Sequence, residues 1–411
     1  SAEKKWPVII AFEPAGWGLI PVKLFKNAAE KYGYIVVCSN NSRNGPWKDI
    51  IRSMKSVWID IHQRFSINDR RVYTTGFSGG ARAASLFSQI IGVEPAGIIA
   101  CGAGLQEKLN PSQIKGSFYY GIIGLEDFNY KEFQRLVPEL EKAGVRYCID
   151  YVPGIHKWPD EDVVNRAIEW MEVDSVLRGI TKEDKGRTDK IFLNSKAYAE
   201  SLMEGDKFYY GVLYLGSITK HFKMILPVDD LEIKINMLIK EKRFIQFKKE
   251  ENDRYKKEYQ FIGNFKKVFS LLKNKKNMRF GLQSVLNDLR VRYLLNLDKK
   301  KKRSFNSYWA KRLLYEIAIK ANRFSFIYSD KKDEKRAILF GELAVGTEVN
   351  KNLYNFRLAS IYAVFGKKKR CIKIIKPLLK EVDNLMDFIE KDPNFNELLK
   401  DPDFMSVFIN K

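Results

Sequence analysis

Residues 71–84 read RVYTTGFSGGARAA, and this stretch decides the fold of the chain. A run of β-forming residues ends at Thr75, the pentad GFSGG follows at 76–80, and small residues then continue in a helical pattern. A Gly-x-Ser-x-Gly turn between a strand and a helix is typical of a nucleophile elbow, which pushes a serine hydroxyl outward. Glycines flank such a serine because the strand and the helix pack closely together. The stretch therefore predicts Ser78 as a nucleophile.

The segments around this stretch alternate between strand and helix patterns up to about residue 172. Short apolar runs predict buried strands at 7–12, 34–38, 71–75, 97–101, 117–123 and 147–152. Amphipathic segments between them predict helices at 21–31, 50–65, 81–91, 131–143 and 160–171. Strands that alternate with helices indicate a parallel sheet covered by helices on both faces.

A serine hydroxyl is a weak nucleophile unless a histidine takes its proton and a carboxylate holds that histidine in the right tautomer. The chain has three histidines. His62 falls inside a predicted helix and His221 lies in the later, basic part, so we expect both to be surface or packing residues. His156 follows the last predicted strand, in a loop that starts a helix. It is the predicted base.

The carboxylate should come from the end of the preceding strand, and residues 117–124 lead directly into Glu126 and Asp127. The chain order Ser78, Asp127, His156 is the order of the triad in α/β-hydrolases. On the residues alone Glu126 remains an alternative acid, or else a solvated loop carboxylate.

Residues 6–172 resemble the α/β-hydrolase superfamily, within it the polyhydroxybutyrate-depolymerase-like, feruloyl-esterase-like and dienelactone-hydrolase-like serine esterases. The resemblance is carried by 76–80, by GLEDFNY at 124–130, and by GIHKWP at 154–159 with AIEW at 167–170. It implies hydrolysis of carboxylic esters through an acyl-enzyme. We expect neither a metal nor another cofactor. Ser78 would be the nucleophile, His156 the general base and then acid, and Asp127, favoured over Glu126, the residue that orients the histidine.

The oxyanion loop departs from the usual lipase and esterase pattern. The first strand ends in FEPAGWG at 12–18 where a His-Gly-Gly-Gly run would be expected. One oxyanion donor should be the backbone N–H of Gly79, the residue after the nucleophile. Pro14 has no N–H, so we predict Ala15 as the second donor. We expect Glu13 to point away, because an ionised carboxylate would disfavour an oxyanion.

Further residues are predicted to contact the substrate. The segment SNNSRNGPW at 39–47 follows the second strand on the same edge of the sheet. Asn41 and Trp47 there, together with Trp158 beside the predicted base, could shape an acyl or sugar pocket. An ordinary Asn- and Gly-rich turn is the alternative for this segment. No long insertion separates the predicted strands between Ser78 and Asp127, which favours an open site over a deep lipase-type tunnel.

Charge divides the chain unevenly. Residues 1–180 contain 22 Lys and Arg against 20 Asp and Glu, whereas residues 181–411 contain 50 against 30. An excess of +20 in the second part either solvates the outer faces of helices or attracts an acidic partner. Neither zinc-finger spacing nor an aromatic-studded strand pattern accompanies the charge, so we do not expect nucleic-acid binding.

The second part shows helical periodicity throughout and a repeat with a period of 34 residues. In that repeat Tyr362 corresponds to Tyr328, Cys371 to Ala337, and Leu378 to Ala344. A period of 34 is that of tetratricopeptide repeats, which the end of the chain resembles. We predict a catalytic domain at 1–178 and a basic α-helical domain at 179–411, with the repeats clearest at 324–408. These helices would either bind a protein or peptide, or support the first domain structurally.

Two other functions remain open on the residues alone. One is a serine peptidase of the same fold, since the same triad transfers acyl groups from amides. The other is a non-catalytic scaffold that binds a protein through its repeats. No apolar run in the sequence is long enough to span a membrane, so we expect the chain as given to be soluble, with or without a leader removed before its first residue. The resemblance implies a bacterial periplasmic, cell-envelope or secreted protein over a cytoplasmic one.

Overall fold

The computed structural model describes residues 4–274, 281–299 and 305–409. The chain divides into two compact units, Ser1–Glu251 and Asn252–Lys411. The long helix α10 (Lys242–Lys273) begins in the first unit and ends in the second.

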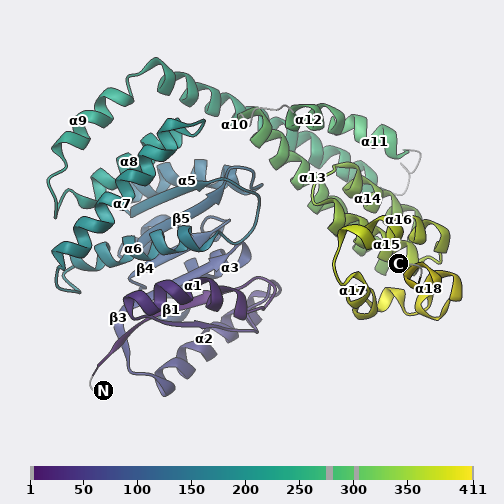
Figure 1. Cartoon of the computed structure of the whole chain (residues 1–411), viewed down its shortest axis with the longest axis horizontal. Helices are drawn as coiled ribbons and strands as arrows, with labels where there is room; N and C mark the ends of the chain where they lie inside the picture. The colour runs from purple at the N-terminus through teal and green to yellow at the C-terminus, as the bar shows by residue number, and fades with distance from the viewer. Residues whose placement is uncertain (1–3, 275–280, 300–304, 410–411) are drawn as a thin grey trace. The chain divides into compact units, whose positions relative to one another are not determined.

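The first unit is built on a six-stranded, wholly parallel sheet with the strand order β2-β1-β3-β4-β5-β6 (Figure 1). The strands are β1 (Trp6–Phe12), β2 (Ile35–Cys38), β3 (Ile67–Phe77), β4 (Gly97–Cys101), β5 (Phe118–Gly124) and β6 (Arg146–Val152). All six predicted strands are therefore confirmed, and β3 is longer than predicted. Near-continuous apolar runs mark them because both faces of a parallel sheet are covered.

Helices cover both faces of the sheet, as predicted. They are α1 (Leu19–Tyr32), α2 (Trp47–Arg64), α3 (Gly79–Ser85), α4 (Phe87–Ile91), the 3₁₀ turn η1 (Pro111–Ile114), α5 (Tyr130–Ala143) and α6 (Glu161–Leu177). Right-handed crossovers place α1 on one face and α2 to α5 on the other, and α6, which follows β6, packs against α1. The single helix predicted at 81–91 is broken at Leu86, whose φ of −88° and ψ of 0° separate α3 from α4.

The three helices after the predicted domain boundary belong to the first unit. They are α7 (Lys185–Glu204), α8 (Phe208–Phe222) and α9 (Asp229–Leu238). Ile191 of α7 and Tyr214, Ile218 and Phe222 of α8 are buried in one apolar core with sheet residues such as Ile99. The division at Glu251 thus differs from the predicted boundary at 178/179, because α7 and α8 complete the core of the sheet.

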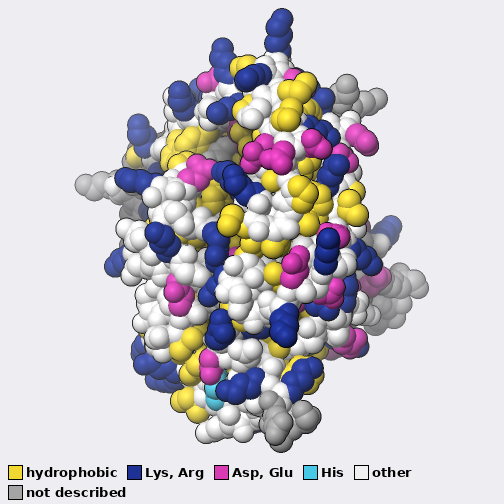
Figure 2. Space-filling model, turned by 90° about the vertical axis from the view of Figure 1, so that its left-hand side faces the viewer, with side chains coloured by type: hydrophobic (Ala, Val, Ile, Leu, Met, Phe, Trp, Pro, Cys, Tyr) yellow, Lys and Arg dark blue, Asp and Glu magenta, His cyan; other side chains and the backbone are white. Residues whose placement is uncertain are grey.

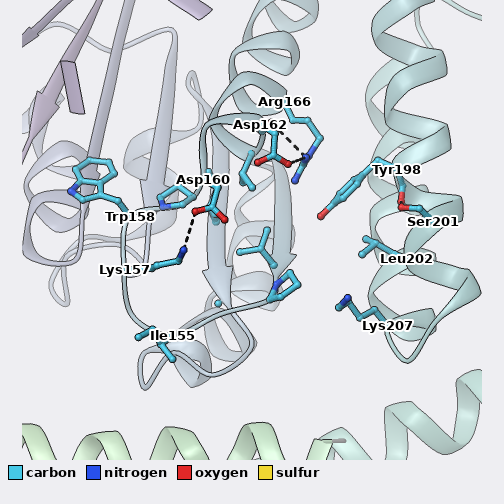
Figure 3. A pocket seen from close by; sticks show the side chains of 17 residues that line it. Ile155, Lys157, Trp158, Asp160, Asp162, Arg166, Tyr198, Ser201, Leu202 and Lys207 are labelled. Atoms are coloured by element: carbon cyan, nitrogen blue, oxygen red, sulfur yellow. Dashed lines mark hydrogen bonds and ion pairs between the residues drawn. The ribbon is translucent and has the colours of Figure 1, made fainter. Parts of the chain in front are cut away.

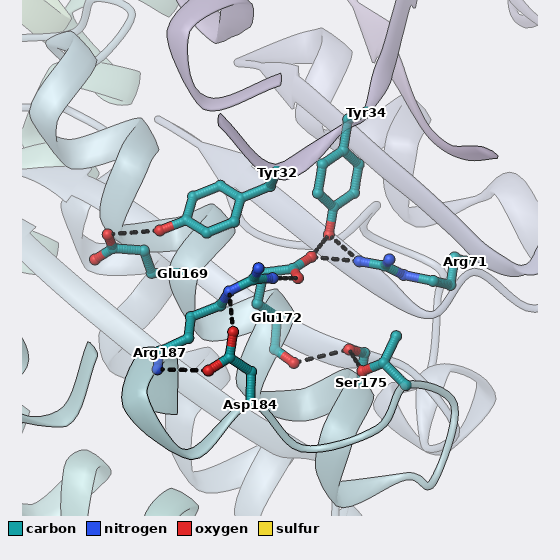
Figure 4. A network of polar contacts seen from close by, with 9 residues as sticks. Tyr32, Tyr34, Arg71, Glu169, Glu172, Ser175, Asp184 and Arg187 are labelled. Carbon is teal, nitrogen blue, oxygen red and sulfur yellow. Dashed lines mark hydrogen bonds and ion pairs between the residues drawn. The ribbon is translucent and has the colours of Figure 1, made fainter. Parts of the chain in front are cut away.

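A buried polar network also joins α7 to the sheet (Figure 4). The Glu172 carboxylate of α6 accepts hydrogen bonds from Tyr34, just before β2, and from Arg71 of β3. Arg71 also donates to the Tyr34 hydroxyl at 2.8 Å. Arg187 of α7 reaches the other Glu172 oxygen at 3.4 Å. The polar residues at the start of α7 therefore include a charge that is paired inside the protein.

The second unit is helical in its described part. Its helices after α10 are α11 (Leu282–Asp288), α12 (Val291–Asp298), α13 (Phe305–Asp330), α14 (Glu334–Gly346), α15 (Lys351–Val364), α16 (Lys368–Glu381), α17 (Leu385–Lys391) and α18 (Pro402–Ile409), with 3₁₀ turns η3 (Pro393–Phe395) and η4 (Leu398–Lys400). Helices α13 to α16 pack in sequence order, and α14 and α16 begin 34 residues apart. The helical class is as predicted, whereas the repeat type stays a prediction.

Most of the net charge lies in the second unit. Residues 1–251 contain 36 Lys and Arg against 32 Asp and Glu, and residues 252–411 contain 36 against 18. On the face drawn in Figure 2, which is mostly that of the first unit, Lys and Arg side chains are interspersed with acidic ones. In the described residues, no helix combines the length and the apolarity needed to cross a membrane.

Candidate active site

The turn after β3 has the backbone geometry of a nucleophile elbow. Ser78 has a φ of 54° and a ψ of −117°, a conformation that residues with a side chain seldom adopt. Its N–H donates to the Cys101 carbonyl at 2.8 Å. A Cβ on Gly76 would lie 2.3 Å from the Gly80 carbonyl oxygen, and one on Gly80 would lie 1.9 Å from that of Phe12. Glycine is therefore required at both positions, and Ser78 is held out at the carboxyl edge of the sheet.

The structure brings the three predicted triad residues into one hydrogen-bonded chain. His156 Nε2 lies 2.9 Å from Ser78 Oγ, and His156 Nδ1 lies 2.8 Å from Asp127 Oδ2. The three side chains come from loops after β3, β5 and β6, which end at the same edge of the parallel sheet. With Nδ1–H donating to the carboxylate, the lone pair of Nε2 faces the serine hydroxyl. This is the tautomer that can accept its proton.

The carboxylate that contacts the histidine is that of Asp127, which is 1% exposed. Its second oxygen, Oδ1, accepts from the Asn129 backbone N–H at 2.8 Å, and the Asn129 side chain donates to the Gly102 carbonyl at 2.8 Å. The neighbouring Glu126 is also buried, and its N–H donates to the Gly154 carbonyl at 2.9 Å. Both oxygens of Asp127 are thus fixed, which aims one of them at His156.

Two aromatic rings hold the imidazole. Phe77 lies 4.5 Å and Phe128 4.3 Å from the His156 ring, centroid to centroid, and the histidine side chain is only 15% exposed. Sequence reasoning assigned no role to these two phenylalanines or to Asn129. The signal was present, because each directly adjoins a triad residue or follows Asp127 within a two-residue turn.

The predicted second oxyanion donor is engaged elsewhere. The N–H of Ala15 donates to Glu13 Oε2 at 2.7 Å, and the N–H of Trp17 donates to the same oxygen at 2.9 Å. Glu13 is 4% exposed and folds back into its own loop. The Ala15 N–H is therefore not available as the predicted oxyanion donor, because it is hydrogen-bonded to the Glu13 carboxylate. The other predicted donor, Gly79, is the first residue of α3, where N–H groups have no acceptor within the helix.

The three predicted substrate residues lie in different environments. Asn41 is exposed, and its backbone N–H donates to Ser39 Oγ at 3.1 Å. Trp47 is 39% exposed and begins α2. Trp158 is partly buried, with its ring 5.6 Å from that of Phe77 and packed on the main core. Asn41 and Trp47 are thus accessible to a ligand, whereas much of Trp158 supports the phenylalanine beside the histidine.

A cavity of about 320 Å³ adjoins the histidine loop (Figure 3). Loop residues on both sides of His156 form one wall and α7 forms the other. Arg166 of α6 lies over the ring of Tyr198 at 3.7 Å, and both bond the buried carboxylate of Asp150. Lys157 pairs with Asp160 at 2.9 Å. Ser78 does not line this cavity, so we do not assign it as the acyl pocket.

The other two histidines have structural surroundings. His62 lies on α2, where its Nε2 is 2.9 Å from Asp69 Oδ1. His221 of α8 is buried; its ring is stacked on Trp170 with the centroids 4.8 Å apart, and it is tilted against Phe118 with the centroids 4.5 Å apart. Burial lowers the pKa of His221 to about 3, so it is neutral at physiological pH. Within the described residues, no group of three or more His, Cys, Asp or Glu side chains is placed to hold a metal ion.

The chain is similar to solved structures only at low sequence identity. No family model matches the chain, and no curated protein matches it. Among similar solved structures, an uncharacterized protein from Bacillus cereus ATCC 10987 is 17% identical with a TM-score of 0.37, over 42% of this chain and 61% of that one. An S-formylglutathione hydrolase from Staphylococcus aureus is 15% identical with a TM-score of 0.34, over 42% and 85%. A ferulic acid esterase is 16% identical with a TM-score of 0.32, over 41% and 83%.

The chain spans about three fifths of the length of the first of these structures. The class follows from the chain's own features: a parallel sheet of this strand order, flanking helices on both faces and a nucleophile elbow after β3 fit the α/β-hydrolase fold.

Proposed function

We propose that this chain is a serine hydrolase that cleaves carboxylic esters through an acyl-enzyme. The observation that supports this most strongly is the chain of hydrogen bonds from Ser78 Oγ through His156 to Asp127, at 2.9 and 2.8 Å. Nothing about a packing role requires a strained serine, a clamped imidazole and a buried carboxylate in that order. Together they are the groups that acyl transfer needs.

The first half of the reaction forms the acyl-enzyme. His156 Nε2 takes the proton of Ser78 as Oγ attacks the ester carbonyl carbon, and the carbonyl oxygen becomes an oxyanion. Asp127 stabilises the imidazolium and stays ionised. When the tetrahedral intermediate collapses, the carbon–oxygen bond to the alcohol breaks, and the alkoxide leaves with the proton from Nε2.

The second half releases the acid. His156 Nε2 takes a proton from water as the water oxygen attacks the acyl carbon, and the proton returns to Ser78 Oγ as the acyl bond breaks. Phe77 and Phe128 hold the ring in one plane through both halves, so the same nitrogen serves as base and acid. The exposed Asn41 and Trp47 are the proposed contacts for the substrate.

The test is hydrolysis of a panel of short- and long-chain aryl esters by the full chain and by its Ser78→Ala and His156→Ala variants. We expect kcat to fall about 10⁴-fold or more in each, with unchanged thermal stability, because neither side chain belongs to the apolar core. Undiminished turnover in Ser78→Ala would overturn the proposal. Turnover of peptide substrates in preference to esters would move it to the peptidase class.

A helical repeat surface for a protein or peptide partner is part of the same proposal. Support comes from the ordered packing of α13 to α16 and from the 34-residue spacing of α14 and α16. The net charge of residues 252–411 favours an acidic partner. Isothermal titration with acidic and basic peptides of equal length tests this, and equal weak binding of both would contradict it.

A further inference from the structure

The oxyanion loop, residues 13–18, uses its backbone N–H groups internally. Ala15 and Trp17 donate to the Glu13 carboxylate, and Gly16 donates to the Glu13 carbonyl at 3.1 Å. The N–H of Gly18 donates to Asn40 Oδ1 at 3.0 Å. Each of these hydrogens has an acceptor inside the protein.

Pro14 has no N–H. Each backbone N–H from Ala15 to Gly18 is therefore hydrogen-bonded within the protein. None of the loop residues 14–18 thus offers a backbone N–H to an oxyanion.

Asn44 is the side chain that lies against the residue after the nucleophile. A Cβ built on Gly79 would meet Asn44 Oδ1 at 1.9 Å and Asn44 Nδ2 at 3.1 Å. Asn44 is anchored in this place because its own N–H donates to the Pro14 carbonyl at 2.8 Å. The carboxamide therefore lies against Gly79, the first residue of α3 and the residue that follows Ser78.

We propose that the Asn44 side chain supplies the second oxyanion hydrogen bond, in the place that Ala15 cannot take. A turn of the carboxamide about its Cβ–Cγ bond, which is a soft torsion, presents Nδ2–H to an oxygen bound at Gly79. A neutral amide donor suits this task because it stabilises negative charge without competing for the proton of Ser78. The inference rests on the proposed ester hydrolysis at Ser78.

The same contact explains why residue 79 is a glycine. Its backbone is helical, so alanine would be tolerated conformationally. The added methyl group would instead push the Asn44 carboxamide away, because the end of that side chain is the nearest atom. Gly79→Ala should therefore act on catalysis through Asn44, while the Gly79 N–H itself is kept.

The experiment compares Asn44→Ala and Asn44→Asp with the full chain on one neutral aryl ester. We expect kcat to fall about 10²- to 10³-fold in Asn44→Ala with KM changed by less than about threefold, since the bond forms only as the oxyanion develops. Asn44→Asp keeps the shape but has no N–H donor, so it should lose at least as much. Asn68→Ala, on the opposite end of β3 from Ser78, is the matched control and should keep wild-type kcat.

A double-mutant cycle sharpens the test. Gly79→Ala should lower kcat about as much as Asn44→Ala, and the double variant should be no worse than either, because one contact is removed in both. Wild-type kcat in Asn44→Asp, or a rise in KM without a fall in kcat in Asn44→Ala, would overturn the assignment. Fluorophosphonate labelling of Ser78 separates this failure from that of the proposed function: loss of the oxyanion role alone leaves Ser78 labelled and required.

Discussion

The two units of this protein differ in where their functionally informative residues lie. In residues 1–251 the informative side chains stand at the ends of strands, where the parallel sheet collects Ser78, Asp127 and His156 at one edge, and charge is nearly balanced. In residues 252–411 the pattern is regular helix packing with a large basic excess. In a parallel sheet, candidate catalytic residues can be found because they lie at the ends of strands. In a helical array, the sequence indicates the fold class and the net charge but not the ligand.

The largest effect is expected when the chain is shortened to the domain boundary that the sequence predicted. A chain ending at Arg178 lacks α7 and α8, whose buried side chains Ile191, Tyr214, Ile218 and Phe222 complete the core of the sheet. Burial of each contributes about 1.5–3 kcal/mol, so together they rival the total stability of a typical domain. We expect this chain to be insoluble or unfolded by circular dichroism.

The matched chain ends at Glu251, where the first compact unit ends. It should be soluble, unfold cooperatively and keep activity on a small aryl ester. A stable, active chain ending at Arg178 would show that α7 and α8 are dispensable and would restore the boundary predicted from the sequence.

The next effect separates two adjacent carboxylates. Asp127→Asn should lower kcat about 10⁴-fold, because the amide can hold His156 in the wrong tautomer. Glu126→Gln should lower kcat less than about tenfold, since the His156 ring bonds Asp127. Steady-state kinetics of both variants on one ester gives the order, and the reverse order would transfer the orienting role to Glu126.

A smaller effect concerns acid stability within the first unit. The folded pKa of His221, about 3, lies below its ordinary value of 6.5, so its contribution to stability is fully present above pH 6.5 and is lost as pH falls towards 3. Between pH 7.5 and pH 5 this amounts to about 2 kcal/mol. Urea unfolding at both pH values measures it.

His221→Phe is the control for that measurement. A phenyl ring fits the stack on Trp170 and Phe118 and cannot take up a proton. The variant should lose about 2 kcal/mol less than the wild type on acidification. An identical loss in both proteins would mean that other groups govern the acid sensitivity.

The smallest expected effect tests whether the charge of residues 252–411 changes the proposed hydrolysis by residues 1–251. Residues 252–411 carry 36 Lys and Arg against 18 Asp and Glu, and such a field raises the encounter rate of anions at low salt. We expect kcat/KM for a carboxylate-bearing ester to fall about two- to fivefold between 20 and 200 mM NaCl. A neutral ester, and the chain ending at Glu251, should show no such fall; equal behaviour of both esters in the full chain would assign the charge to solvation.

Most of the sheet could be predicted because buried parallel strands appear in the sequence as short apolar runs. All six strands were found, and the loops after β3, β5 and β6 pointed to the residues that the structure brings together. The boundary could not be predicted, because Arg187 lies in a stretch as polar as a linker. Its partner Glu172 becomes apparent only when α6 and α7 are packed.

The oxyanion loop shows why the rest of the site was missed. The sequence predicts Ala15 as the second oxyanion donor because Pro14 has no N–H. The Glu13 carboxylate folds back onto its own loop and accepts that hydrogen bond, and no sequence pattern indicates this. Asn44 is 35 residues from Gly79 in the chain, and only the folded structure brings the two together. Sequence patterns can identify functional side chains at the ends of strands. Side chains that reach the site from a neighbouring loop can be identified only from the tertiary structure.

The most direct test of the central claim is covalent labelling with a fluorophosphonate, followed by peptide mapping by mass spectrometry. We expect one adduct, on the peptide that contains Ser78, because among the described residues Ser78 is the serine bonded to a histidine that can take its proton. Labelling should vanish in Ser78→Ala and fall sharply in His156→Ala. An adduct on a different serine, or full labelling of the Ser78→Ala variant, would contradict the account.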